Sequence, residues 1–229
     1  MKIKNKKNMP KRIIIMILGN LLIALGITAY RTGILGVDPF SCMNLGISLF
    51  IHRDFGTCQL IMNIMLFIIV FILMRGMIGA GTIVNMAGIG YCVDFFTWLS
   101  ANVFHISASL PVKFICLISG TLLVGLGCAF YMETNMGTSP YDSLGFIIEK
   151  VTKSKIRFSA ARIITDLTCV IIGTVFCLMS KNSFALVLGI GTIVNAACTG
   201  PLISFFRKHI AKPMLTRQAD KTASHDTTI

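Results

Sequence analysis

The chain has 229 residues, of which 55% are hydrophobic and 13% charged, and its formal net charge is +12 at pH 7. Its mean hydropathy is +0.80. No soluble fold of this length has enough polar surface to cover so much apolar side chain, so the composition excludes a soluble globular protein and indicates an integral membrane protein.

Six apolar runs approach or exceed the roughly 20 residues that an α-helix needs to cross the hydrocarbon core of a bilayer. They lie at residues 13–30, 57–74, 77–99, 112–132, 160–179 and 183–206. We therefore predict an all-α membrane protein with about six transmembrane helices, with the lipid bilayer as its first partner.

The first run follows a basic segment, residues 1–12. It is too long for a signal peptide and has no clear small-residue cleavage site, so we expect an uncleaved membrane helix. With the N-terminus in the cytoplasm, most lysines and arginines fall on inner segments, and the positive-inside rule then places both termini in the cytoplasm. The positive charge reflects membrane topology, and nucleic acid is not expected as a partner.

A short polar motif follows the first run and recurs after the fourth. The two copies are Gly-Val-Asp-Pro-Phe-Ser at 36–41 and Gly-Thr-Ser-Pro-Tyr-Asp at 137–142. Both are typical helix starts, because Asp38 and Ser139 are good N-caps. Pro39 and Pro140 come next, at the first helical position, where no amide hydrogen is needed.

The helices that these motifs begin are apolar but short, at residues 39–51 and 140–151. Helices of this length cannot cross the hydrocarbon core, so we predict two half-helices that are re-entrant or lie at the interface. In the re-entrant arrangement their N-termini meet near the middle of the membrane, where free amides and partial positive charge can hold a polar or anionic group.

The motifs belong to an internal duplication of about half the chain. Residues 13–41 align with 114–142, Phe55 aligns with Phe158, and Asn63 aligns with Asp166. The segment Gly-Thr-Ile-Val-Asn at 81–85 recurs at 191–195, and this match continues through Gly90 with Gly200 to Phe96 with Phe206. We divide the chain into a basic N-terminus, two membrane repeats and a polar cytoplasmic tail, at residues 1–12, 13–108, 109–209 and 210–229.

The orientation of the repeats depends on the half-helices. Three spans per repeat is an odd number, which turns the second repeat upside down relative to the first. If the short helices crossed the membrane, the repeats would instead be parallel. The distribution of charge fits both arrangements, so our preference for inverted repeats rests on helix length.

Polar residues inside the runs fall at equivalent positions, Asn63 with Asp166 and Asn85 with Asn195. A carboxylate within a span is costly unless it faces a partner, the bundle interior or water, so Asp166 is a functional candidate. Arg162, one turn earlier, offers the alternative of a structural ion pair. For the asparagines, hydrogen bonding between helices and lining of a transport path both stay open.

These observations give a set of candidate solute-binding residues: Asp38, Pro39, Ser41, Ser139, Pro140, Asp142, Asn63, Asp166, Asn85 and Asn195. We expect no catalytic residues, because no motif of a known hydrolase, nucleotide-binding loop or metalloenzyme occurs. The eight cysteines and four histidines have no metal-ligand spacing, so no metal or cofactor is expected.

The run LGVDPFSCMNLGIS at 35–48, with GTIVN and its copy, resembles the YczE/YyaS/YitT group of bacterial integral membrane proteins. The resemblance covers nearly all of the membrane part. It implies a protein of the bacterial inner membrane and carries no agreed biochemical activity.

The sequence thus favours a carrier or channel for a small solute of unknown identity, and a homo-oligomer stays open as a further assembly. The alternative is a membrane scaffold or regulatory partner that transports nothing. A water-accessible cavity at the level of Pro39, Pro140, Asn85 and Asn195 would favour transport, whereas a closed bundle would favour the scaffold.

Overall fold

The computed structural model describes residues 9–33, 35–53, 55–103, 109–180 and 189–215. In these ranges the secondary structure is helical, with no strand. The α-helices are α1 (Met9–Gly33), α2 (Pro39–Ile51), α3 (Phe55–Met74), α4 (Ala80–Asn102), α5 (Leu110–Glu133), α6 (Pro140–Val151), α7 (Phe158–Met179) and α8 (Ile190–Phe206). A 3-10 turn, η2 (Arg75–Met77), follows α3, and a π-helical turn, η4 (Arg207–Ala211), continues α8. The all-α prediction is confirmed.

Five helical segments are long and apolar enough to cross a membrane, namely α1, α3 with η2, α4, α5 and α7. They coincide with five of the six predicted runs. The sixth run corresponds to α8, whose 17 residues continue through η4 without a break; the predicted start of this run, at 183, lies outside the described residues. Large apolar side chains such as Ile72 and Ile171 are exposed on the outer faces, as expected for contact with lipid.

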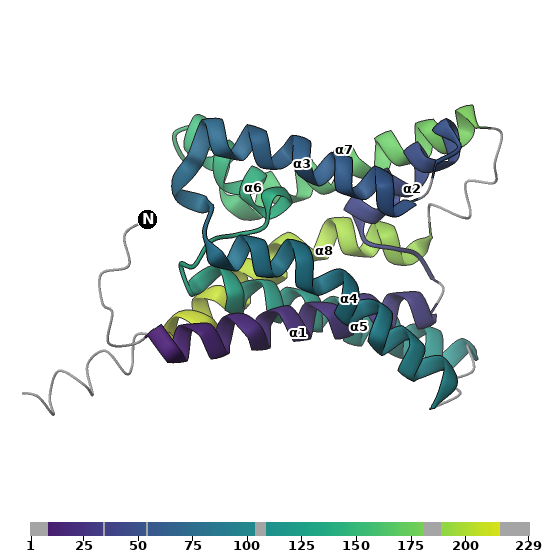
Figure 1. Cartoon of the computed structure of the whole chain (residues 1–229), viewed down its shortest axis with the longest axis horizontal. Coiled ribbons are helices and arrows are strands. Elements are labelled where there is room, and N and C mark those ends of the chain that lie inside the picture. Colours follow the sequence, from purple (N-terminus) through teal and green to yellow (C-terminus); the bar gives the residue numbers. More distant parts are fainter. Residues whose placement is uncertain (1–8, 34, 54, 104–108, 181–188, 216–229) are drawn as a thin grey trace, which may run out of the picture.

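Figure 1 shows the helices in two groups. On one side α1 packs against α4 and α5, and on the other α7 packs against α2 and α6, with α3 contacting both half-helices. α8 contacts both α5 and α7 and so joins the two groups.

The first helices of the two halves, α1 and α5, cross at glycines. A Cβ atom added to Gly19 would lie 2.8 Å from the carbonyl oxygen of Gly127, and one added to Gly26 would lie 2.8 Å from that of Gly120. Small residues at a helix crossing let the backbones approach closely. Because the earlier glycine of α1 meets the later one of α5, the two helices are antiparallel.

The short helices begin where the motifs predict, at Pro39 and Pro140, and contain 13 and 12 residues. The Asp38 carboxylate accepts a hydrogen bond from the Ser41 amide at 3.0 Å, and the Ser139 hydroxyl accepts one from the amide three residues later at 3.1 Å. Their first turns are buried among other helices, so they start inside the bundle. From there α2 extends towards one end of the molecule and α6 towards the other (Figure 1).

Each half-helix entry loop is held by the GTIVN segment of the opposite half. The Gly81 amide donates to the Met136 carbonyl at 2.8 Å, and the Gly191 amide donates to the Leu35 carbonyl at 2.9 Å. These two bonds are equivalent under the sequence alignment, which pairs residue 35 with 136 and residue 81 with 191. The repeated segment therefore has a structural reason, since it anchors the backbone from which the half-helices start.

The glycines of the two motifs are required at these anchors. Gly36 and Gly137 have φ values of 139° and 111°, a region that residues with a side chain rarely adopt. A Cβ at Gly36 would also lie 2.6 Å from the Thr192 hydroxyl, and one at Gly137 would lie 2.5 Å from the Thr82 hydroxyl.

Candidate solute-binding site

A cavity of about 330 Å³ lies where the N-terminal ends of α2 and α6 face each other. All eight α-helices contribute to its wall. Ligand sites of small molecules are typically clefts of a few hundred Å³ with a few convergent polar groups in a largely apolar wall. The cavity has this character, because aliphatic side chains such as Ile23, Ile27 and Val124 alternate with carboxylates and amides.

Nine of the ten candidate residues line this cavity: Asp38, Pro39, Ser41, Asn63, Asn85, Ser139, Asp142, Asp166 and Asn195. The tenth, Pro140, does not, because it is fully buried in the first turn of α6. Its role in the structure is to start the helix.

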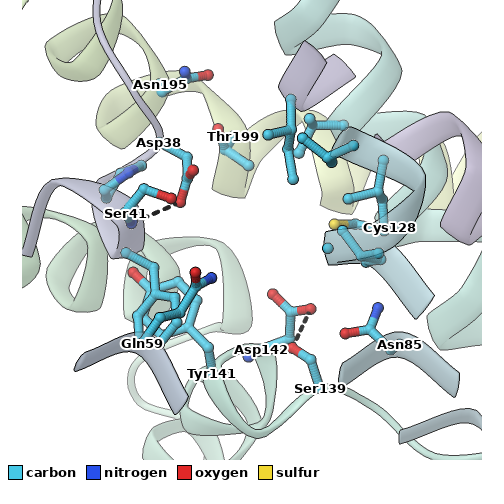
Figure 2. A pocket seen from close by; sticks show the side chains of 18 of the residues that line it. Asp38, Ser41, Gln59, Asn85, Cys128, Ser139, Tyr141, Asp142, Asn195 and Thr199 are labelled. Atoms are coloured by element: carbon cyan, nitrogen blue, oxygen red, sulfur yellow. Dashed lines mark hydrogen bonds between the residues drawn. The ribbon is translucent and has the colours of Figure 1, made fainter. Parts of the chain in front are cut away.

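Figure 2 shows Asp38 and Ser41 on one wall of the cavity and Ser139 with Asp142 on another. We expected the free amides of these helix starts to be available to a solute. Each cap takes one of these amides, since Asp38 accepts from the Ser41 amide and Ser139 accepts from the Asp142 amide. The helix starts also bring two carboxylates, Asp38 and Asp142, into the lining of the cavity.

Arg162 connects three acidic or aromatic side chains at the base of the cavity. Its guanidinium forms an ion pair with the Asp142 carboxylate, and its Nε lies 3.2 Å from Oδ1 of Asp166. Its Cζ atom lies 4.3 Å from the centre of the Tyr141 ring. The predicted pairing with Asp166 is present, but Asp142 provides a second partner that the spacing along α7 could not indicate.

The carboxylates of this cluster also accept hydroxyl hydrogen bonds. Asp142 accepts from Tyr131 and, at 2.7 Å, from Ser139. Asp166 Oδ1 accepts from the Tyr141 hydroxyl at 2.5 Å. Buried charges require such partners. The network is incomplete, because Nε of Arg162 and Oδ2 of Asp166 have no hydrogen-bond partner among the described residues.

The two asparagines of the GTIVN segments bond to equivalent positions of α1 and α5. Asn85 donates to Asn20 Oδ1 at 2.8 Å, and Asn195 Oδ1 accepts from the Thr121 hydroxyl at 3.2 Å. Residues 20 and 121 are equivalent in the alignment. Asn195 Oδ1 also accepts from the Tyr30 hydroxyl at 2.5 Å. Both asparagines therefore form hydrogen bonds between helices, as the first alternative predicts, and both also line the cavity. Lining of a transport path stays a prediction.

The two halves differ on the side of the cavity formed by α3 and α4. In the second half, a Cβ atom added to Gly200 of α8 would lie 2.6 Å from the Ser159 carbonyl oxygen of α7. At the equivalent Gly90 of α4, an added Cβ would meet nothing within 4 Å. α8 is thus packed on α7, whereas α4 stands away from α3. Gln59 of α3 lines this side, at the position equivalent to Arg162.

The two ends of the molecule also differ. At the end where α1 finishes, Arg31 lines the cavity and pairs with Asp94 at 3.1 Å, with both side chains exposed. At the end where α5 finishes, Arg207 pairs with Glu133 at 2.9 Å in a more buried position. The guanidinium of Arg207 also lies 5.0 Å from the centre of the Phe146 ring. The cavity therefore reaches an exposed ion pair at one end, and a shielded ion pair occupies the other.

The chain belongs to the family described as a family of unknown function (DUF6198), whose model matches residues 10–208. It is 29% identical over 206 residues to the uncharacterized protein YyaS of Bacillus subtilis (strain 168), covering 87% of this chain and 94% of the relative. It is 23% identical over 188 residues to the uncharacterized membrane protein YczE of the same strain, covering 82% and 81%. No solved structure gives a significant match. The resemblance drawn from the LGVDPFSCMNLGIS and GTIVN motifs is confirmed.

Proposed function

We propose that this member of the DUF6198 family is a carrier for a small solute, built from two inverted repeats in the bacterial plasma membrane. The observation that carries the proposal is the cavity between the N-terminal ends of α2 and α6, where the equivalent motifs of the two halves meet. Inverted repeats with discontinuous helices that meet near the midplane are the architecture of many secondary transporters.

The antiparallel crossing of α1 and α5 supports the inverted arrangement. These two helices are equivalent in sequence, so helices that run in opposite directions belong to repeats of opposite orientation. The hydrogen bonds of the Gly81 and Gly191 amides support it as well, because each half donates to the equivalent carbonyl of the other half.

The difference between Gly90 and Gly200 favours a carrier over a channel. One half is closed by close packing of α8 on α7, and the other half is open between α3 and α4. If the halves exchange these arrangements, α4 packs on α3 while α8 leaves α7, and the cavity becomes accessible from the opposite end. Such an exchange is how inverted repeats produce alternating access.

The charge distribution supports a direction for the two ends. With both termini in the cytoplasm, the Arg31–Asp94 end lies outside the cell and the Arg207–Glu133 end lies inside. The arrangement described above then corresponds to the outward-facing state.

A disulfide trap tests the exchange without knowledge of the solute. The variant has its native cysteines replaced by alanine and new cysteines at positions 59 and 90. These positions are equivalent to Arg162 and Gly200, where a Cβ atom added to Gly200 would lie 3.1 Å from the Cβ of Arg162. The carrier model predicts that mild oxidation in proteoliposomes crosslinks 59 to 90, because closure brings α3 against α4.

The matched control pairs position 90 with a cysteine at 61, which lies two residues along α3 on its exposed face. This pair should remain reduced. If the 59 and 90 pair crosslinks no faster than the control pair, the two halves do not exchange arrangements, and a static scaffold becomes the better account.

A further inference from the structure

The charged residues that line the cavity do not balance. Among the described residues of the lining, the charged ones are Arg31, Asp38, Asp142, Arg162 and Asp166. Arg31 is paired with Asp94, which is outside the lining. Arg162 faces two carboxylates, and no ion pair to Asp38 occurs within the described part of the chain. The cavity therefore holds an excess of negative charge.

An anionic solute finds no unpaired cationic side chain among the described residues of the lining. The guanidinium of Arg162 is already held between Asp142 and Asp166 and stacked on the Tyr141 ring. One amide at each helix start, that of Ser41 and that of Asp142, is already held by its own cap. Within a site of low polarity, the carboxylates would repel an anion and attract a cation.

A second observation points to a bound molecule. Asn195 is 1% exposed and lines the cavity, yet its Nδ2 atom has no hydrogen-bond partner among the described residues. Its Oδ1 atom, by contrast, accepts hydrogen bonds from Tyr30 and Thr121, which fixes the orientation of the amide. Leaving a buried amide donor unsatisfied is costly. A solute that carries a hydroxyl or carbonyl oxygen would accept this hydrogen bond.

The size and the walls of the cavity favour an organic cation over a metal ion. The described residues contain no cluster of three or more side chains of the types that hold a metal. The volume of about 330 Å³ is far larger than a single dehydrated ion requires. Aliphatic side chains of α1, α4 and α5, such as Ile27, Ile89 and Val124, can cover a short carbon chain.

We infer that the solute is a small organic amine in its ammonium form that also carries an oxygen acceptor. Its ammonium group lies between the carboxylates of Asp38 and Asp142, and its oxygen accepts from Asn195. This inference names the substrate class of the carrier proposed above and rests on that proposal for its physiological meaning.

Three probes of one carbon skeleton test the charge preference: 4-amino-1-butanol as the cation, 1,4-butanediol as the neutral solute and 4-hydroxybutyrate as the anion. Binding to purified protein in detergent is measured by isothermal titration calorimetry. The cation is expected to bind at least about tenfold more tightly than either of the others, the difference that one charge-assisted hydrogen bond provides.

The variant Asp38→Asn separates charge from folding. Asparagine is as good an N-cap as aspartate, so α2 keeps its start while the cavity loses one negative charge. We expect affinity for the cationic probe to fall about tenfold or more in this variant. The control Glu149→Gln removes one carboxylate outside the cavity lining and should bind like the unmodified protein.

Binding of the anion or the neutral probe as tightly as the cation would overturn the inference, and so would the absence of binding by all three. Unchanged cation affinity in Asp38→Asn would also contradict it. Calorimetry measures binding and does not require transport, so it separates this inference from the carrier proposal. Selective binding of the cation without a crosslink between positions 59 and 90 would support the binding site and contradict the carrier.

Discussion

The buried Arg162 network predicts an ordered series of stability losses. Arg162, Asp142 and Asp166 are 7%, 5% and 0% exposed, so solvent screens their interactions little. Removing one partner of a buried ion pair typically costs about 3–5 kcal/mol, because the remaining charge loses its compensation. The variant Arg162→Gln leaves two uncompensated carboxylates and should lie in this range.

The expected loss of about 3–5 kcal/mol can be expressed as a decrease in melting temperature. For a chain of this length, 1 kcal/mol corresponds to a shift of roughly 2–4 °C, so Arg162→Gln is expected to lower Tm by about 6–20 °C. Asp166→Asn should lower Tm less, because Arg162 keeps its ion pair with Asp142 and asparagine keeps the size of the side chain. Its expected cost is about 1–3 kcal/mol.

Thermal unfolding of purified protein in detergent measures this series, with Lys150→Gln as the control for loss of one exposed positive charge. The control should change stability by no more than about 0.5 kcal/mol. If Arg162→Gln has the same Tm as the control, or if Asp166→Asn lowers Tm more than Arg162→Gln does, the ion pairs of Arg162 do not provide this stability.

Two further predictions use matched positions. Gly19→Ala should lower Tm, because the new Cβ would lie 2.8 Å from the Gly127 carbonyl oxygen. Gly90→Ala should leave Tm unchanged or raise it by up to roughly 2–4 °C, the shift that about 1 kcal/mol of helix propensity provides. Equal destabilisation by both would contradict the open packing at Gly90. In intact cells, a cysteine at position 53 should react with an impermeant maleimide from outside, and one at position 153 should react only after permeabilisation; protection at 53 with reaction at 153 would reverse the proposed orientation.

The half-helices were the most predictable part of the fold. Asp38 and Ser139 are caps followed by proline, and this local chemistry sets the start of each helix whatever packs around it. The ends were also predicted, at residues 51 and 151, because the apolar run stops there. Local signals of this kind act within one helical turn.

The contacts of the site were less predictable, because they join distant segments. The pairing of Arg162 with Asp142 links α7 to α6 across a turn, and no regular spacing relates the two positions. Gln59 was missed because a single amide near a helix start has no distinctive pattern. Gly90 and Gly200 show a further limit, since identical residues in equivalent segments have different surroundings. The packing of neighbouring helices decides this difference.

The proposed carrier moves a solute through this cavity and across the membrane by alternating access. Uptake of radiolabelled 4-amino-1-butanol into proteoliposomes, with and without unlabelled 4-amino-1-butanol inside, tests it most directly. We expect uptake above that of protein-free liposomes and faster uptake when the inside is preloaded, because a carrier returns more quickly when loaded. Uptake no greater than in protein-free liposomes, or uptake that preloading does not accelerate, would contradict it.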